Sequence, residues 1–199
     1  MKISVISTSH RKNSESKRIS KIFSDLIFEL NSSIECFNLD MFELNIPLWT
    51  SEKKENSNFW DNKVKQISSE LNSSDGFVFV VPEYGGMATP NSKNFFLIFN
   101  NGEVFHKPGL IVSISSGNGG AYPISELRSS SYKNSHIMWI PENIIIRNVE
   151  QFLPGNHGNL IPVWIDDRIN YSCNLLLKYA EYLKPIQKFI NRKDFANGM

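Results

Sequence analysis

Short apolar runs alternate with amphipathic stretches along most of this chain. Five runs of six or seven residues have the Val, Ile, Leu and Phe content that is typical of strands in a buried sheet. We predict these strands at 2–7, 34–39, 76–81, 109–114 and 143–149. Elsewhere, apolar residues recur every three or four positions, which indicates helices with one buried face. We predict these helices at 15–30, 59–71, 90–100, 121–133 and 166–191.

The alternation of strand and helix repeats through the chain, without an internal repeat or a low-complexity linker. It predicts a single α/β domain over 1–199, with a doubly wound five-stranded parallel sheet and helices on both faces. Right-handed crossovers favour the strand order 2-1-3-4-5. Ligands of such sheets bind beyond the carboxyl ends of the strands, near the point where the order reverses. The loops after the first, third and fourth strands should therefore meet.

Composition excludes several classes of protein. The 199 residues include 21 Lys and Arg and 20 Asp and Glu, and this near-zero balance argues against a nucleic-acid partner. Cys36 and Cys173 lie far apart and the histidines share no metal spacing, so we expect neither disulfides nor a metal site. No stretch approaches the roughly 20 apolar residues of a transmembrane helix, and the first residues are expected to form a strand, not a signal peptide. We expect a cytoplasmic protein with no membrane partner.

The first of the three loops, Ser7–Ser16, is rich in hydroxyl groups and carries Arg11 and Lys12. It leads directly into a helix, whose first amides and dipole favour an anion, and its serine and arginine side chains add donors. A terminal phosphate would suit this loop, although it lacks the glycine fingerprints of dinucleotide and triphosphate sites. The alternative is that Ser14 or Ser16 only caps the helix while the cations stay in solvent.

The other two loops contain glycines. The second reads PEYGGMATP at 82–90 and is followed by Lys93-Asn94; its glycines allow close approach to a ligand, and Tyr84 offers a flat ring. A plain glycine turn is the alternative. The third, SISSGNGGA at 113–121, can hydrogen-bond the edge of a planar polar ring through its amides. Three such loops at one sheet edge together indicate a ligand site.

These loops resemble the motifs of the NAD(P)H-dependent FMN reductase family, which has the flavodoxin-like fold. PEYGG followed by KN is similar to the family's PEYNGSxPGxLKN signature, and SHRKNSES is similar to its GSxRxxS-type phosphate loop. SISSGNGGAYPISELR resembles the segment around its fourth strand. The resemblance covers about residues 2–135. It implies FMN as the cofactor and NAD(P)H as the co-substrate.

Carried over by position, the resemblance assigns three groups of FMN-binding residues. The phosphate would lie against Ser9, Arg11, Ser14 and Ser16; the isoalloxazine ring would be lined by Pro82, Glu83, Tyr84 and Gly85; and its other edge would meet Ser115, Ser116 and Gly117. The nicotinamide would stack over the exposed flavin face. The resemblance also implies a homodimer or homotetramer, with the helix after the second motif at the dimer contact.

The chain departs from the family pattern at several positions. After Asn94, the usual Ala-(Ile/Leu)-Asp-Trp is replaced by Phe95–Ile98, which alters the helix expected at the dimer contact. The other departures lie in the loops, where Thr8 replaces a glycine, Gly85 an asparagine, Met87 a serine and Thr89 a proline.

The sequence therefore suggests an FMN-dependent NAD(P)H oxidoreductase that passes hydride through FMN to a small acceptor: free flavin, a quinone, an azo compound or a metal oxyanion. Because the cofactor carries the hydride, we expect no catalytic side chain. An FMN-binding module without reductase activity and an electron-transfer flavoprotein are the alternatives. The tryptophans are expected mostly to pack in the interior, and Trp49 and Trp139 are candidates for the rim of a substrate opening.

Overall fold

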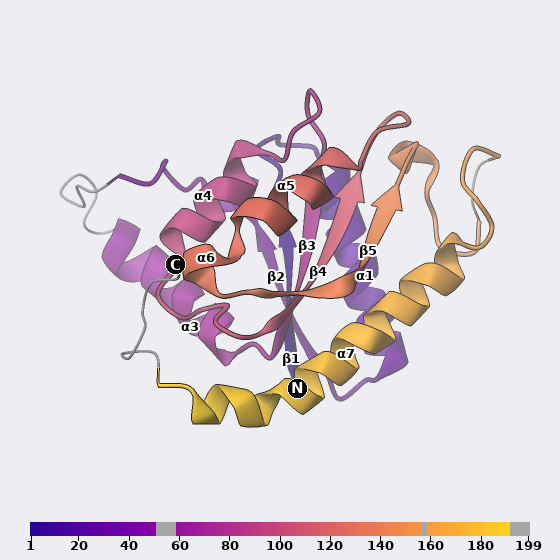
Figure 1. Cartoon of the computed structure of the whole chain (residues 1–199). Helices are drawn as coiled ribbons and strands as arrows, with labels where there is room; N and C mark the ends of the chain where they lie inside the picture. Colours follow the sequence, from indigo (N-terminus) through magenta and orange to yellow (C-terminus); the bar gives the residue numbers. More distant parts are fainter. Residues whose placement is uncertain (51–58, 157–158, 192–199) are drawn as a thin grey trace.

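A computed structural model describes residues 1–50, 59–156 and 159–191. Within them, five strands form one all-parallel sheet in the order β2-β1-β3-β4-β5, which confirms the predicted order (Figure 1). The strands are β1 (Lys2–Ser7), β2 (Glu35–Asp40), β3 (Gly76–Pro82), β4 (Pro108–Ile114) and β5 (Met138–Ile146). Their carboxyl ends share one edge, which is uppermost in Figure 1.

Helices cover both faces of the sheet. The five longest are α1 (Glu15–Leu30), α3 (Lys65–Ser73), α4 (Pro90–Ile98), α5 (Tyr122–Ser130) and α7 (Ile165–Phe189). The first and last of these pack on one face, and α3, α4 and α5 pack on the other. In the described part of the chain, no helix is long and apolar enough to cross a membrane.

The two central strands β3 and β4 are buried at every position, because helices lie on both sides of them. Alternate residues of β3 face opposite layers of the core: Val78 and Val80 pack with α1 and α7, whereas Phe77 and Phe79 pack with α3, α4 and α5. The second layer is strongly aromatic. Phe79 stacks on Phe96 of α4, with ring centroids 5.2 Å apart.

The strand predicted at 143–149 was misplaced. The structure has β5 at Met138–Ile146, five residues earlier at its start, and Val149 belongs to the short 3₁₀ helix η2 (Val149–Gln151). Pro141 and Glu142 argue against a strand in the sequence, but β5 is an edge strand, where a proline costs no ladder hydrogen bond on the solvent side.

Three other elements differ from the sequence prediction. The segment between the strand predicted at 34–39 and the helix predicted at 59–71 begins with a helical turn, α2 (Met41–Leu44), in which Met41 and Leu44 are buried. Residues 51–58 lie outside the described part of the chain. The predicted helix 59–71 starts as a π-helix, η1 (Phe59–Val64). The predicted helix 121–133 is divided into α5 and the short α6 (Tyr132–Ser135).

Candidate functional site

The three loops singled out in the sequence meet at the carboxyl edge of the sheet and enclose a pocket of about 230 Å³. Eight of the predicted site residues line it: Arg11, Ser14, Ser16, Pro82, Glu83, Tyr84, Ser115 and Ser116. The other three predicted residues, Ser9, Gly85 and Gly117, lie in the same loops but do not line the pocket. Parallel strands thus bring together residues as far apart in the sequence as Arg11 and Ser116.

The first loop ends at the N-terminus of α1, where serine hydroxyls form a chain. Ser7 Oγ donates to Ser16 Oγ, Ser16 Oγ donates to Ser14 Oγ, and Ser14 accepts from the amide of Lys17 as the N-cap. Ser14 therefore does cap the helix, as the simpler interpretation held. It also lines the pocket together with Arg11, so capping does not remove this end of the helix from the site.

Tyr84 of the second loop is half-buried against the first loop. Its hydroxyl lies 3.1 Å from the hydroxyl of Ser9, whose Oγ also accepts from the amide of Arg11. The Arg11 guanidinium lies 5.6 Å from the Tyr84 ring centroid, and His10 meets the same ring edge-on at 5.3 Å. Ser9 is completely buried, so in this structure it tethers the two loops to each other.

Two departures from the family pattern contact each other. Thr89 Oγ1 donates to the carbonyl oxygen of Thr8 at 2.7 Å, and the hydroxyl of Thr8 donates to the carbonyl of Val80. Thr89 also caps α4 by accepting from the amide of Ser92. Both threonines are fully buried. The replacements at positions 8 and 89 are therefore one linked change that joins the first loop to the second.

The turn Tyr84–Met87 in the second loop is a tight reversal. The amide and carbonyl of Tyr84 pair with those of Met87, while Gly85 and Gly86 have φ of +59° and +74°. Positive φ at both central residues is the type I′ arrangement, which favours Asn-Gly or Gly-Gly. Gly85 is thus compatible with this turn, as an asparagine would be, and the turn exposes Met87 to solvent.

The side chain of Glu83 fixes the third loop. Its Oε2 accepts from the amides of Gly120 (2.7 Å) and Tyr122 (3.3 Å), at the start of α5. A carboxylate at a helix N-terminus satisfies amides that lack partners inside the helix. Because Glu83 belongs to the second loop, this contact sets the position of the third loop relative to Tyr84.

Gly117 lies where the third loop has open space, since a Cβ at this position would meet no atom within 4 Å. Its amide donates to Ser115 Oγ, and its carbonyl accepts from the amide of Asn148. The third loop is therefore held on one side by the segment that follows β5. Space beside an ordered loop is what a ring bound along its edge would need.

Sequence reasoning missed the segment after β5. Arg18 of α1 donates to the carbonyls of Val149 and Phe152 at 2.6 and 2.7 Å, and the amide of Val149 donates to the carbonyl of Ser115. These contacts bring Val149 and Glu150 into the pocket wall. The misplaced last strand concealed this, because it assigned Val149 to the sheet.

A second and larger cavity, of about 650 Å³, lies beside the pocket and shares Tyr84 with it. Trp49, Met87 and Leu97 line this cavity. Trp49, one of the two tryptophans expected at the rim of a substrate opening, therefore lies next to the candidate site. Trp139 is not: it packs against Phe79 in the core.

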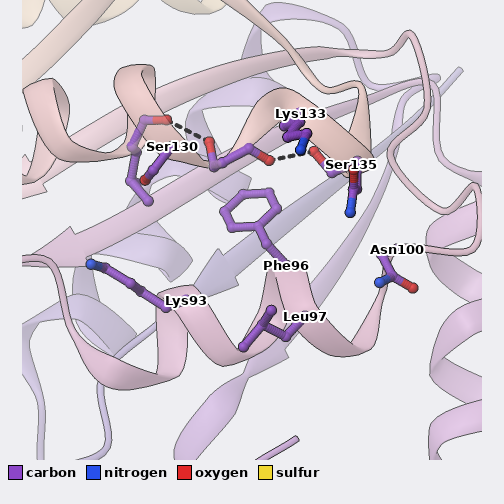
Figure 2. A pocket seen from close by; sticks show the side chains of 10 residues that line it. Lys93, Phe96, Leu97, Asn100, Ser130, Lys133 and Ser135 are labelled. Atoms are coloured by element: carbon purple, nitrogen blue, oxygen red, sulfur yellow. Dashed lines mark hydrogen bonds between the residues drawn. The ribbon is translucent and has the colours of Figure 1, made fainter. Parts of the chain in front are cut away.

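A groove of about 320 Å³ between α4 and α5–α6 carries no comparable chemistry (Figure 2). Phe96 lies at its centre, with Lys93 and Leu97 on the α4 side. Its serines direct their hydroxyls at their own helices: Ser130, Ser131 and Ser135 each donate to a carbonyl four residues earlier. These hydroxyls do not converge on the groove as the polar groups of a ligand site do.

Charged groups near the site are mostly paired. Lys93 forms an ion pair with Glu126, whose Oε2 accepts from the amide of Ala88 at 2.7 Å. Burial opposes ionisation of Glu126, but the contacts with Lys93 and Ala88 outweigh it and lower its pKa. Among the described residues, no group of three or more His, Cys, Asp or Glu side chains could hold a metal ion.

The family follows from comparison of the sequence with known proteins. A family model described as NADPH-dependent FMN reductase matches residues 1–151. The chain belongs to this family. Its cofactor is therefore FMN, and its electron donor is NAD(P)H. A search of curated protein sequences finds no match.

Solved structures share the fold of this family member at low sequence identity. An oxidoreductase from Corynebacterium diphtheriae superposes with a TM-score of 0.69 at 16% identity, over 91% of this chain and 97% of that one. The flavoenzyme NAD(P)H:(acceptor) oxidoreductase FerB from Paracoccus denitrificans gives 0.68 at 18%, over 91% and 97%. A flavodoxin from the domain Archaea gives 0.54 at 12%, over 92% and 99%. The fold is flavodoxin-like.

The residues around the pocket fit FMN in their chemistry. The N-terminus of the 16-residue helix α1, with Arg11 and the serine hydroxyls beside it, suits a phosphate. The space at Gly117 leaves room along the third loop for a planar ring, whose polar edge backbone amides can recognise. A flavin enzyme requires no catalytic pair of titratable side chains, because the cofactor carries the hydride.

Proposed function

We propose that this protein transfers hydride from NAD(P)H, through FMN held in the three-loop pocket, to a small-molecule acceptor. The observation that carries the proposal is the convergence of all three motif loops on one pocket at the carboxyl edge of the sheet. When bound, FMN supplies the hydride chemistry, and the protein supplies binding and orientation.

Each loop has a distinct task in this proposal. Arg11, Ser14 and Ser16 hold the phosphate, and Ser9 keeps the first loop against Tyr84. Pro82, Glu83, Tyr84 and Gly85 line one side of the ring. Ser115, Ser116 and Gly117 line its other edge.

Glu83 acts through the third loop. Because its carboxylate is bound to the amides of Gly120 and Tyr122, it contributes to the cradle by fixing that loop. Backbone donors of a loop that is fixed in advance would be available to stabilise negative charge on a bound ring.

The acceptor in this proposal is a free flavin, a quinone, an azo compound or a metal oxyanion. We further propose that the protein works in the cytoplasm as a homodimer or homotetramer. The family resemblance, which implies a dimer contact at the helix after the second motif, supports this assembly.

A visible absorbance spectrum of the purified protein with FMN, recorded anaerobically before and after NADPH and then NADH, tests the function. We expect a bound-flavin spectrum that bleaches with at least one donor. Bound flavin that stays oxidised with both donors would instead indicate electron transfer between protein partners. Failure to bind FMN would leave a flavodoxin-like module without this activity.

A further inference from the structure

Asn94 attaches the segment Pro47–Trp49 to α4. Its Oδ1 accepts from the backbone amide of Trp49 at 2.8 Å, and its Nδ2 donates to the carbonyl of Pro47 at 3.0 Å. Asn94 itself is 2% exposed. A buried amide that satisfies both its oxygen and its nitrogen on one stretch of backbone holds that stretch in a single place.

This attachment determines where the side chain of Trp49 lies. Residues 46–50 belong to no helix or strand, so the hydrogen bonds of Asn94 replace the backbone pairing that a regular element would provide. Trp49 and its neighbour Leu48 line the 650 Å³ cavity beside the candidate flavin pocket, together with Leu97 of α4 and Met87 of the second loop.

The cavity wall is apolar and open to solvent. Leu48 is 69% exposed, Met87 58%, Leu97 48% and Trp49 47%. Four large apolar side chains that stay in water around one hollow form a surface that a ligand would cover. The charges in the same wall, Lys93 and Glu126, already neutralise each other.

Both features point to the same class of ligand. A planar, uncharged ring matches apolar walls that include an indole and a phenol ring. Among the described residues of this wall, the lysine Lys93 is already paired with Glu126, which makes the cavity a poor site for a metal oxyanion. Tyr84 lines both the cavity and the three-loop pocket, so a ring in the cavity would lie beside a flavin bound in that pocket.

We propose that Asn94 is a positioning residue for the electron acceptor: it fixes Pro47–Trp49 so that the Trp49 indole forms one wall of a binding site for a planar, uncharged ring such as a quinone. The inference rests on the proposed function, because it assumes that electrons leave FMN toward this cavity. Asn94 also lines the cavity, but its side-chain oxygen and nitrogen are both hydrogen-bonded to the backbone of Pro47–Trp49. It acts through Trp49.

Steady-state kinetics with two acceptors tests the role of Asn94. The FMN-loaded wild-type protein, the variants Asn94→Ala and Trp49→Ala and the double variant are assayed with duroquinone, a planar, uncharged quinone, and with ferricyanide, a charged complex that does not need this binding site. We expect each single variant to raise the KM for duroquinone about tenfold, with kcat for ferricyanide and the Kd for FMN unchanged. The KM of the double variant for duroquinone should be no higher than that of Trp49→Ala, because both substitutions disrupt the same wall of the cavity.

Matched controls separate this role from general damage. Asn174→Ala removes an exposed asparagine of α7, and Trp164→Ala removes a tryptophan that is 61% exposed and lines neither cavity. Both should behave like the wild-type protein. An unchanged duroquinone KM in Asn94→Ala, or a loss of FMN in parallel with the KM effect, would overturn the proposal.

Hydrogen exchange supplies a readout that requires no activity. In protein without NADPH, the Trp49 amide should exchange at least tenfold faster in Asn94→Ala than in the wild type, and at the wild-type rate in Asn174→Ala. If the Trp49 amide exchanges faster in Asn94→Ala but the KM for duroquinone is unchanged, Asn94 holds the backbone without positioning the acceptor, and the proposal is wrong. If neither NADPH nor NADH reduces the bound flavin, the proposed function fails, whereas hydrogen exchange still reports whether Asn94 holds the Trp49 backbone in place. If Asn94→Ala does not fold, an unchanged KM in Trp49→Ala overturns the proposal.

Discussion

Gly85 occupies a backbone conformation that most side chains avoid. Its φ of +59° belongs to the type I′ turn, and a Cβ there would meet only the end of Met87, at 3.7 Å. Backbone strain, and not a lack of space, therefore determines which residues position 85 can accept. Asparagine tolerates positive φ, whereas a β-branched residue is strongly disfavoured there.

Substitutions at Gly85 should consequently differ by backbone preference. We expect Gly85→Val to lower the free energy of unfolding by about 1–3 kcal/mol, the usual cost of a strained residue, and to weaken FMN binding by deforming the loop. Gly85→Asn should change both quantities little. Urea denaturation and flavin fluorescence titration measure the two effects, and wild-type FMN affinity in Gly85→Val would remove this turn from the site.

Arg11 is the exposed cation of the candidate phosphate site. Charge-assisted hydrogen bonds contribute roughly 1.5–3 kcal/mol, so Arg11→Ala should weaken FMN binding about tenfold or more. Riboflavin, which lacks the phosphate, should bind the wild-type protein and Arg11→Ala with the same affinity. Lys12→Ala is the matched control, because Lys12 is an adjacent exposed cation that does not line the pocket. Equal losses for FMN and riboflavin would contradict the assignment.

The sequence was informative about which loops form the site and less so about how they are connected. Hydroxyls, glycines and a tyrosine after buried strands identify the loops, because only residue type and position are needed. The reach of Glu83 to Gly120 and of Asn94 to Pro47 depends on side-chain directions in the folded protein. Nothing in the local sequence specifies such contacts between distant segments.

Among the elements, prediction succeeded where one signal dominated. The continuous apolar runs of β3 and β4 indicate buried central strands, and the apolar face of α1 indicates a helix. Edge strand β5 has mixed burial, with Pro141, Glu142 and Asn143 in its middle, so its pattern is weak. The apolar Val149 then shifted the predicted strand toward the C-terminus.

The long helix α7 contains a thiol that reports on its packing. Cys173 is fully buried, and burial raises the pKa of its thiol to about 12. Cys36 on β2 is half-buried, and burial raises its pKa as well. Because the thiolate is the reactive form, neither cysteine should react rapidly in the folded protein at pH 8.

Alkylation of Cys173 should therefore follow the release of α7 from the sheet. In a Cys36→Ser variant treated with iodoacetamide at pH 8, we expect no modification in buffer and full modification in urea. The midpoint should match that of unfolding followed by circular dichroism. Intact-protein mass spectrometry measures the modified fraction, and fast alkylation in buffer would show that α7 opens independently of the sheet.

At the scale of the whole molecule, topology places the site. The alternation of strands and helices, with right-handed crossovers, leaves few strand orders, and the observed order brings the loops after β1, β3 and β4 to one edge. The two layers of the core share the same central strands, β3 and β4. We therefore expect the chain to unfold as one cooperative unit, in keeping with the predicted single domain.

Binding of FMN should stabilise the whole cooperative unit, because the three loops of the site directly follow β1, β3 and β4 of the sheet. A ligand at a hundred times its Kd adds about 2.7 kcal/mol to the free energy of unfolding. For a chain of this size that shift corresponds to a rise in Tm of about 5–10 °C. Riboflavin at the same concentration should raise Tm less, since it leaves the N-terminus of α1 without its anion. Near- and far-ultraviolet circular dichroism should give one coincident unfolding transition, both with and without FMN. Two separate transitions would contradict a single domain. A Tm that does not change when FMN is added would contradict FMN binding at this site.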